Sequence, residues 1–128
     1  MANVVSASAP PVLQEYYRIL TGGPEAFGAG EGLRPLLSDH LDFTGSLAGH
    51  RPDAPDAFLR GVSGFIQAVQ RIDPVQEVHD GAGSAVLYDA VMPGGVVRFA
   101  EFFAIRDGVI EVLDLVYDGK DYLAKGGR

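Results

Sequence analysis

The sequence predicts an α+β protein in which helices pack on one face of an antiparallel sheet. Three observations support this fold class. Helical spacing of apolar residues is confined to the first part of the chain, strand-like segments follow one another without helices in the last part, and short turn motifs separate those segments. Helices followed by a run of strands are typical of α+β folds and not of alternating α/β folds.

Composition narrows the class of protein. A chain of 128 residues with 47% hydrophobic content is sized for a single domain with a real core, so we expect one domain over residues 1–128. No apolar run approaches the roughly 18 residues of a membrane span. Met1–Pro11 lacks the basic and apolar regions of a secretory signal, which favours a cytoplasmic protein. The net charge of −7 disfavours nucleic acid and anionic membranes as partners.

A first helix is predicted from Pro11 onward, since proline suits the first turn of a helix. Its buried face has the spacing i, i+3, i+4, i+7, and consists of Leu13, Tyr16, Tyr17 and Leu20. Gly22–Gly23–Pro24 is expected to end it. The glycine-rich segment Pro24–Leu37 predicts one or two short helices, and the loosely alternating Leu41–Leu47 predicts a first strand.

A loop is predicted over Gly49–Pro55, and the longest helix is predicted from Pro55 to about Ile72. Its apolar stripe is the clearest helical pattern in the chain, and consists of Phe58, Val62, Phe65, Val69 and Ile72. Asp73–Pro74 is expected to end this helix. Four strands then follow, predicted as Val75–His79, Ser84–Met92, Val96–Arg106 and Val109–Tyr117. Their short connections predict an antiparallel meander.

The last hairpin carries two acidic residues where apolar ones are expected. Its Asp107–Gly108 loop favours a two-residue turn that pairs Arg106 with Val109. Counting back along an uninterrupted ladder pairs Glu101 with Asp114, which would place their Cβ atoms ~4.5–5.5 Å apart on one face. The other residues of that face are apolar: Val97, Phe99, Phe103, Ile105, Ile110, Val112 and Val116.

Two carboxylates this close in a pocket would repel by about 3 kcal/mol at an effective dielectric constant of about 20. One would stay protonated near neutral pH, which supplies a proton donor and a base in one site. We therefore predict Asp114 as the base and Glu101 as the proton donor. Two alternatives remain open: a hairpin paired in another register that leaves the acids at the surface, and a structural pair bonded to backbone and tyrosine.

Three further features bear on the site. Even-numbered residues of the strand before Glu101 share its face, so Tyr88 is predicted to point inward, either as a hydrogen-bond donor to the site or as a core tyrosine. The histidines have no metal-ligand spacing, so no metal site is predicted. His40 is a candidate for the mouth of the pocket, with a surface position as the alternative. The chain has no cysteine, which excludes disulfides and sulfur-ligated metals.

The second face of the last hairpin is also largely apolar, with residues such as Phe102, Leu113 and Leu115. An antiparallel sheet usually exposes one polar face to water. We therefore predict a homodimer formed through the outer face of the sheet, with scattered surface apolar residues as the alternative.

The order of elements and two stretches of sequence resemble the nuclear-transport-factor-2-like superfamily, over about Val12 to Tyr122. The stretches are Arg98–Tyr117, RFAEFFAIRDGVIEVLDLVY, and Asp39–Gly49, DHLDFTGSLAG. This superfamily includes SnoaL-like polyketide cyclases, ketosteroid isomerases and limonene epoxide hydrolases. The resemblance implies a cystatin-like α+β barrel, in which a cone-shaped curved sheet surrounds a pocket capped by helices on its concave face.

The resemblance also suggests roles for some residues. Asp114 falls on the final-strand aspartate that acts as base in SnoaL-like cyclases, if the run is shifted by one residue from the turn. Glu101 stands where ketosteroid isomerases have a protonated acid, in the spacing Arg98–Phe99–Ala100–Glu101. Tyr16 or Tyr17 matches their first-helix tyrosine. The isomerase base is missing, because the equivalent position is about Thr44, and the arginine of the epoxide hydrolases is missing from Ser84–Met92.

The sequence thus predicts a pocket for a small hydrophobic organic ligand. Its expected walls, beside Glu101, Asp114 and Tyr88, are Tyr16 or Tyr17, Phe43, Phe65, Phe99 and Phe103. The predicted chemistry is cofactor-independent acid–base isomerisation or cyclisation of a hydrophobic carbonyl compound. A non-catalytic binding protein and a structural dimerisation module are the alternatives.

Overall fold

The computed structural model describes residues 4–128, and its elements follow the predicted order of helices and strands. The helices are α1 (Pro11–Leu20), α2 (Gly23–Phe27), α3 (Pro55–Ala68) and α4 (Gly119–Ala124), with short 3₁₀ turns at Gly28–Gly30 and Arg34–Leu36. The strands are β1 (Leu37–Gly45), β2 (Gly49–Arg51), β3 (Arg71–His79), β4 (Gly83–Met92), β5 (Gly95–Arg106) and β6 (Val109–Val116).

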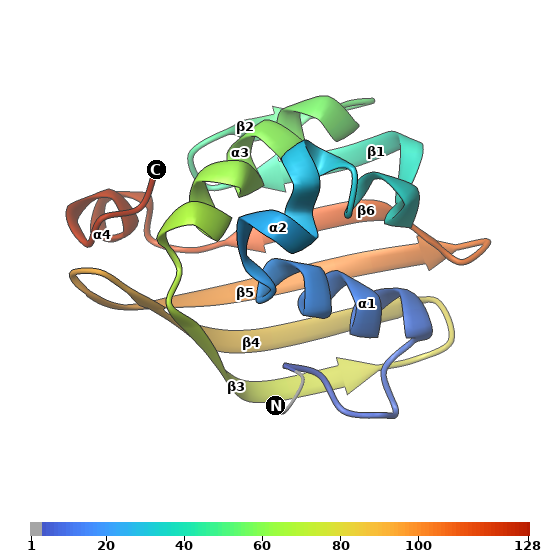
Figure 1. Ribbon diagram of the computed structural model, residues 1–128. Helices are drawn as coiled ribbons and strands as arrows, with labels where there is room; N and C mark the ends of the chain where they lie inside the picture. The colour runs from blue at the N-terminus through green and yellow to red at the C-terminus, as the bar shows by residue number, and fades with distance from the viewer. Residues whose placement is uncertain (1–3) are drawn as a thin grey trace.

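The strands form one six-stranded sheet in the order β2-β1-β6-β5-β4-β3. Helices α1, α2 and α3 lie together on one side of it, and the long central strands curve beneath them (Figure 1). Strands β3 to β6 form the predicted antiparallel meander, but β1 pairs with β6 in parallel. The predicted α+β class is confirmed, and the sheet is mixed where an antiparallel one was expected.

Some elements and boundaries differ from the sequence prediction. Helix α3 ends at Ala68, and Ile72 and Pro74 belong to β3 and not to a helix end. Strand β3 tolerates a proline because it is an edge strand, and its pairing with β4 shifts register just after Pro74. The segment Gly49–Arg51, predicted as loop, pairs with β1, and helix α4 was not predicted.

The last hairpin has the predicted turn but a different register. Asp107 and Gly108 both have positive φ, at 54° and 77°, and Arg106 pairs with Val109. The register then shifts, because Ile105 pairs with Ile110 while Ala104 pairs with Val112. Glu111 is the extra residue of this β-bulge.

The bulge makes the predicted pairing of Glu101 with Asp114 wrong. A shift of one residue moves every later side chain of a strand to the other face of the sheet. Glu101 therefore pairs with Leu115, and Asp114 pairs with Phe102, which is 48% exposed on the outer face. Val112 and Val116 were predicted to face inward but lie on the outer face. Leu113, Leu115 and Tyr117 face inward instead.

The outer face of the sheet remains largely apolar. Phe102, Val78 and Val116 are exposed there, next to the smaller side chains of Ala85 and Ala100. No helix formed by residues 4–128 is both long and apolar enough to cross a membrane.

Candidate functional site

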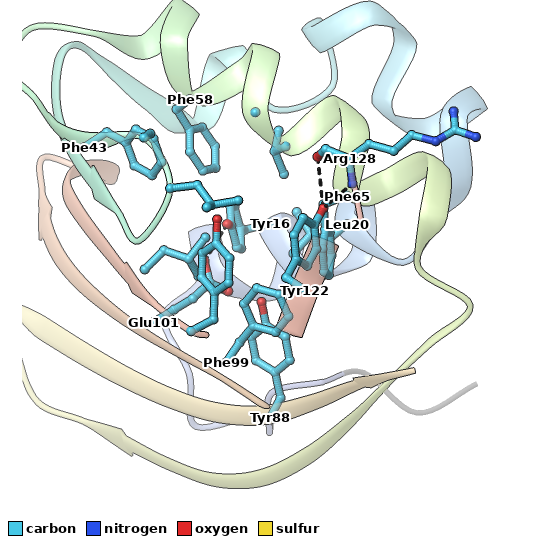
Figure 2. A pocket seen from close by; sticks show the side chains of 16 residues that line it. Tyr16, Leu20, Phe43, Phe58, Phe65, Tyr88, Phe99, Glu101, Tyr122 and Arg128 are labelled. Carbon is cyan, nitrogen blue, oxygen red and sulfur yellow. Dashed lines mark hydrogen bonds between the residues drawn. The ribbon is translucent and has the colours of Figure 1, made fainter. Parts of the chain in front are cut away.

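A cavity of about 300 Å³ lies between helices α1 and α3 and the inner face of the sheet, with α4 at one side (Figure 2). Half of its sixteen lining residues are aromatic. The complete lining consists of Tyr16, Leu20, Phe43, Leu47, Ala48, Phe58, Gly61, Val62, Phe65, Tyr88, Phe99, Glu101, Leu115, Tyr117, Tyr122 and Arg128. Such a wall, apolar with few polar groups, is typical of a small-molecule site.

Glu101 has the one side-chain carboxyl among these lining residues, and it is only 1% exposed. Each of its two oxygens accepts a hydrogen bond from a different tyrosine of α1. Tyr16 donates to Oε2 and Tyr17 donates to Oε1, both at 2.7 Å. The side chain of Glu101 is therefore held from both sides, in the orientation that the helix imposes.

Two neighbouring tyrosines can reach one carboxylate because of how α1 sits on the sheet. Tyr16 and Tyr17 are both buried, and their rings meet edge to face with centroids 5.0 Å apart. Phe103, two residues beyond Glu101 on β5, packs against the edges of both rings. This packing fixes the two hydroxyls above Glu101.

Burial raises the pKa of Glu101 above its usual value, although hydrogen bonds from Tyr17, Tyr16 and Tyr88 act in the opposite direction. Burial, followed by the nearby charge of Glu101, raises the pKa of each of these tyrosines well above its ordinary value. The tyrosines thus stay protonated as donors. Glu101 is the titratable group of the cavity whose protonation is shifted toward neutral pH.

Stacked rings build the wall beside Glu101. Tyr88 of β4 stacks on Phe99 of β5, its cross-strand partner, with centroids 5.4 Å apart. Tyr117 and Tyr122 continue the series, with Tyr117 4.8 Å from Phe99 and 5.3 Å from Tyr122. On the opposite side, Phe43 of β1 meets Phe58 of α3 edge to face.

The segment after β6 closes one side of the cavity. The Tyr122 hydroxyl of α4 donates to the Arg128 carbonyl at 3.2 Å, and the Gly94 amide donates to the Lys125 carbonyl at 2.9 Å. Close packing depends on glycine here, because a Cβ at Gly127 would lie 2.3 Å from the Tyr122 ring. Exposed residues at the rim, such as Leu47 and Ala48, form the mouth.

The structure separates the predicted site residues into three groups. Tyr16, Phe43, Phe65, Tyr88, Phe99 and Glu101 line the cavity. Tyr17 and Phe103 are buried behind this lining, where Tyr17 supports Glu101 and Phe103 packs on both tyrosines.

Asp114 and His40 form the third group, which lies outside the cavity lining. Asp114 is directed to the outer face by the bulge, so it has no access to Glu101 through the sheet. The His40 side chain is 83% exposed and its Nδ1 bonds to Asp53 at 2.6 Å. The prediction of His40 at the pocket mouth is wrong, because this residue comes before the stretch of β1 that pairs continuously with β6.

Sequence reasoning missed part of the lining. Phe58 and Val62 belong to the same helical stripe as Phe65, so their spacing could have identified them. The inward direction of Tyr117 follows from the alternation of side chains along β6 only once the position of the bulge is known. Tyr122 and Arg128 have no sequence signal, because tertiary contacts of the last segment bring them to the cavity. Residues 4–128 contain no group of three or more His, Cys, Asp or Glu side chains arranged to hold a metal ion.

Comparison with solved structures identifies the fold. An NTF2-like protein of unknown function from Cytophaga hutchinsonii superposes with a TM-score of 0.62 at 14% identity, over 92% of this chain and 99% of that one. The chain has the nuclear-transport-factor-2-like fold. A protein of Kribbella flavida shares this fold with a TM-score of 0.78 at 20% identity, over 94% of each chain.

A third similar structure comes from Catenulispora acidiphila. It has a ketosteroid isomerase-like fold and is in complex with trimethylamine, and it matches with a TM-score of 0.67 at 12% identity, over 93% of this chain and 94% of that one. No protein-family model matches the sequence, and no curated protein sequence is similar to it. Identities this low show the fold, so the function must be argued from the cavity.

Proposed function

We propose that this protein binds a compact, mainly apolar organic molecule in the aromatic cavity, with one polar group of the ligand directed at Glu101. The observation that carries the proposal is the buried carboxyl of Glu101, at the inner end of a cavity whose other walls are almost entirely apolar. An apolar pocket with a few convergent polar groups is the usual form of a small-molecule site.

The size of the cavity supports a small ligand. Its volume of about 300 Å³ is at the lower end of the range of ligand pockets. The complex of the Catenulispora protein with trimethylamine is a case of a compact molecule bound by a protein of this fold. A purely structural module would have no need of an open cavity, or of a carboxyl buried within it.

Acid–base catalysis at Glu101 is a second candidate function, favoured by the raised pKa of this carboxyl. Since Asp114 lies on the outer face, Glu101 would have to act alone. Its carboxylate would take a proton from a carbon next to a carbonyl and return it to another carbon of the same ligand. Tyr16 and Tyr17 would stabilise the carboxylate between the two transfers.

We also propose that two copies associate through the outer face of the sheet. Val78, Phe102 and Val116 are 60%, 48% and 55% exposed there, and they lie on neighbouring parts of β3, β5 and β6. An exposed apolar face of this kind is typical of an interaction surface. Such a dimer would not cover the cavity linings, which lie between the helices and the inner face of the sheet.

Blocking the cavity tests the binding function. A library of small apolar compounds is screened by ligand-observed NMR against the wild type, Val62→Trp and Arg60→Trp. Val62 lines the cavity, so its replacement would fill the cavity with an indole, whereas Arg60 is exposed on the same helix. We expect binding to be lost in Val62→Trp and kept in Arg60→Trp. Compounds that bind all three proteins equally would contradict the proposal.

The catalytic candidate has a separate test. Ketones that bind the cavity are incubated in D₂O, and deuterium entering the carbon next to the carbonyl is followed by NMR. We expect exchange with the wild type and with Asp114→Asn, and none above background with Glu101→Gln. Equal exchange by Glu101→Gln and the wild type would rule out Glu101 as the base.

A further inference from the structure

The hydroxyl protons of Tyr16 and Tyr17 are directed at Glu101 and not into the cavity. Tyr16 and Tyr17 both donate to Glu101 at 2.7 Å, so each proton is already used in a bond inside the protein. A phenol has one proton to donate and two lone pairs, and an ionised carboxylate only accepts. The polar atoms that Tyr16 and Glu101 offer to the cavity are therefore lone pairs.

The negative charge of the Glu101 carboxylate has no partner from the protein. None of the ion pairs formed among residues 4–128 includes Glu101. Arg128 is the one cationic residue of the lining, but its guanidinium bonds to Gln67 and points away from Glu101 (Figure 2). A buried carboxylate without a counter-charge is costly, so it either takes up a proton or pairs with a cation supplied from outside.

The rest of the wall suits a cation that carries alkyl groups. Aromatic faces are electron-rich and attract ammonium groups lying within about 6 Å of the ring centre. Half of the residues that line the cavity are aromatic, among them Tyr88, Phe99 and Tyr117 beside Glu101 and Phe58 opposite. The net charge of −7 adds a long-range attraction for small cations.

We propose that the ligand of this cavity is a compact organic cation, an alkylated ammonium, whose charge is placed between the Glu101 carboxylate and the aromatic wall. This inference rests on the proposed binding function and narrows its ligand class. Both α1 hydroxyls already donate to Glu101, so neither can donate to a neutral carbonyl compound placed beside this carboxylate. An alkylammonium at the same place needs only acceptors and aromatic rings, and the cavity offers both there.

Two probes of the same shape test the inference. Choline carries a trimethylammonium group, and 3,3-dimethylbutan-1-ol is its neutral carbon isostere. Their dissociation constants are measured by NMR titration of the ¹⁵N-labelled full chain at about pH 8, because raising the pH increases the fraction of the carboxylate form. We expect choline to bind at least about tenfold more tightly than the alcohol, equivalent to about 1.4 kcal/mol, and its shifts to include cavity residues.

Two matched variants locate the source of the preference. Glu101→Gln keeps the shape of the side chain and removes its charge, and should bring the two dissociation constants to within about twofold of each other, or about 0.4 kcal/mol. Asp114→Asn removes a charge from the same hairpin on the outer face and should keep the wild-type ratio. A preference for choline that survives Glu101→Gln would overturn the assignment.

The outcomes for the wild type separate this inference from the binding function. Equal or tighter binding of the alcohol in the cavity would overturn the cation inference and leave the binding function standing. If neither probe shifts any cavity residue while apolar compounds of the library do, the cation inference also fails alone. If no compound of either kind binds there, both proposals fail.

Discussion

Removing the Tyr17 hydroxyl offers a sharp test of how Glu101 is held. Tyr17 is buried behind the cavity lining, so Tyr17→Phe deletes one hydrogen bond to Oε1 of Glu101 without changing the wall that a ligand would meet. Glu101 would keep its bond from Tyr16 at 2.7 Å. The change therefore probes the carboxylate and not the shape of the site.

The expected loss of stability depends on pH. A hydrogen bond to a charged group contributes about 1.5–3 kcal/mol, and one between neutral groups about 0.5–1.5 kcal/mol. Because burial raises the pKa of Glu101, this group binds its proton more tightly in the folded than in the unfolded chain. Its ionisation therefore lowers the free energy of unfolding as pH rises from the ordinary value of 4.5 to the folded-state value, and the effect is constant above that. Tyr17→Phe removes a hydrogen bond that lowers the pKa of Glu101 in the fold, so it should extend this decline to higher pH and make the total loss larger.

Urea unfolding followed by circular dichroism measures the effect. We expect Tyr17→Phe to lower the free energy of unfolding by about 1.5–3 kcal/mol at high pH, where Glu101 is ionised in the fold, and by less at lower pH. Tyr122→Phe is the matched control, since among residues 4–128 its hydroxyl bonds only to main-chain atoms of Arg128 and to no side-chain carboxyl. A loss for Tyr17→Phe that is the same at every pH, or equal to that of the control, would refute a charged acceptor at Glu101.

Three further predictions concern other parts of the molecule. If the outer sheet face holds a dimer, Phe102→Glu should convert it to monomer in sedimentation velocity runs, while a wild type that is already monomeric would contradict the prediction. Partial burial raises the pKa of Glu77, but hydrogen bonds from Ser6 and His79 outweigh burial and hold this pKa below its ordinary value. The ionised Glu77 therefore stabilises the fold, and this contribution is lost as pH falls through the folded-state pKa. Glu77→Gln should therefore speed hydrogen exchange of the Ser6 amide at neutral pH; unchanged exchange would argue against this contact. Gly127→Ala should lower the free energy of unfolding in urea by about 1–3 kcal/mol, because the new Cβ would overlap the ring of Tyr122 in α4. Gly81→Ala is the control, because a Cβ at Gly81 would meet open space and should change the free energy of unfolding little. Equal losses for the two variants would count against tight packing of the last segment.

Much of the fold could be predicted because its signals are local. The helical stripe of α3, the spacing in α1 and the Asp107–Gly108 turn each depend on neighbouring residues, and the structure has all three. The end of α3 was harder to predict. Pro74 usually ends a helix, but here the edge position of β3 lets it lie in a strand, and that position is set by the whole sheet.

The candidate site was predictable up to the bulge. Glu101, Tyr88 and Phe99 lie on one ladder, whose register is regular from the Gly95 end of β5, so their inward direction follows from alternation. Asp114 lies beyond an inserted residue that no turn motif or apolar pattern marks, because both faces of this hairpin are apolar. With two apolar faces, the sequence does not indicate which set of side chains is the inner one.

The extra residue at Glu111 has a consequence for how this scaffold could acquire new chemistry. Deleting Glu111 would only make the present ladder continuous, because Glu101 would still pair with Leu115 and Asp114 with Phe102. Taking Glu111 into the ladder has the opposite effect: a slip of β6 by one residue would turn Asp114 toward Glu101 and bring Val112 and Val116 inside in place of Leu113, Leu115 and Tyr117. A second acid in a reshaped cavity is thus one step of strand register away, without any change of sequence.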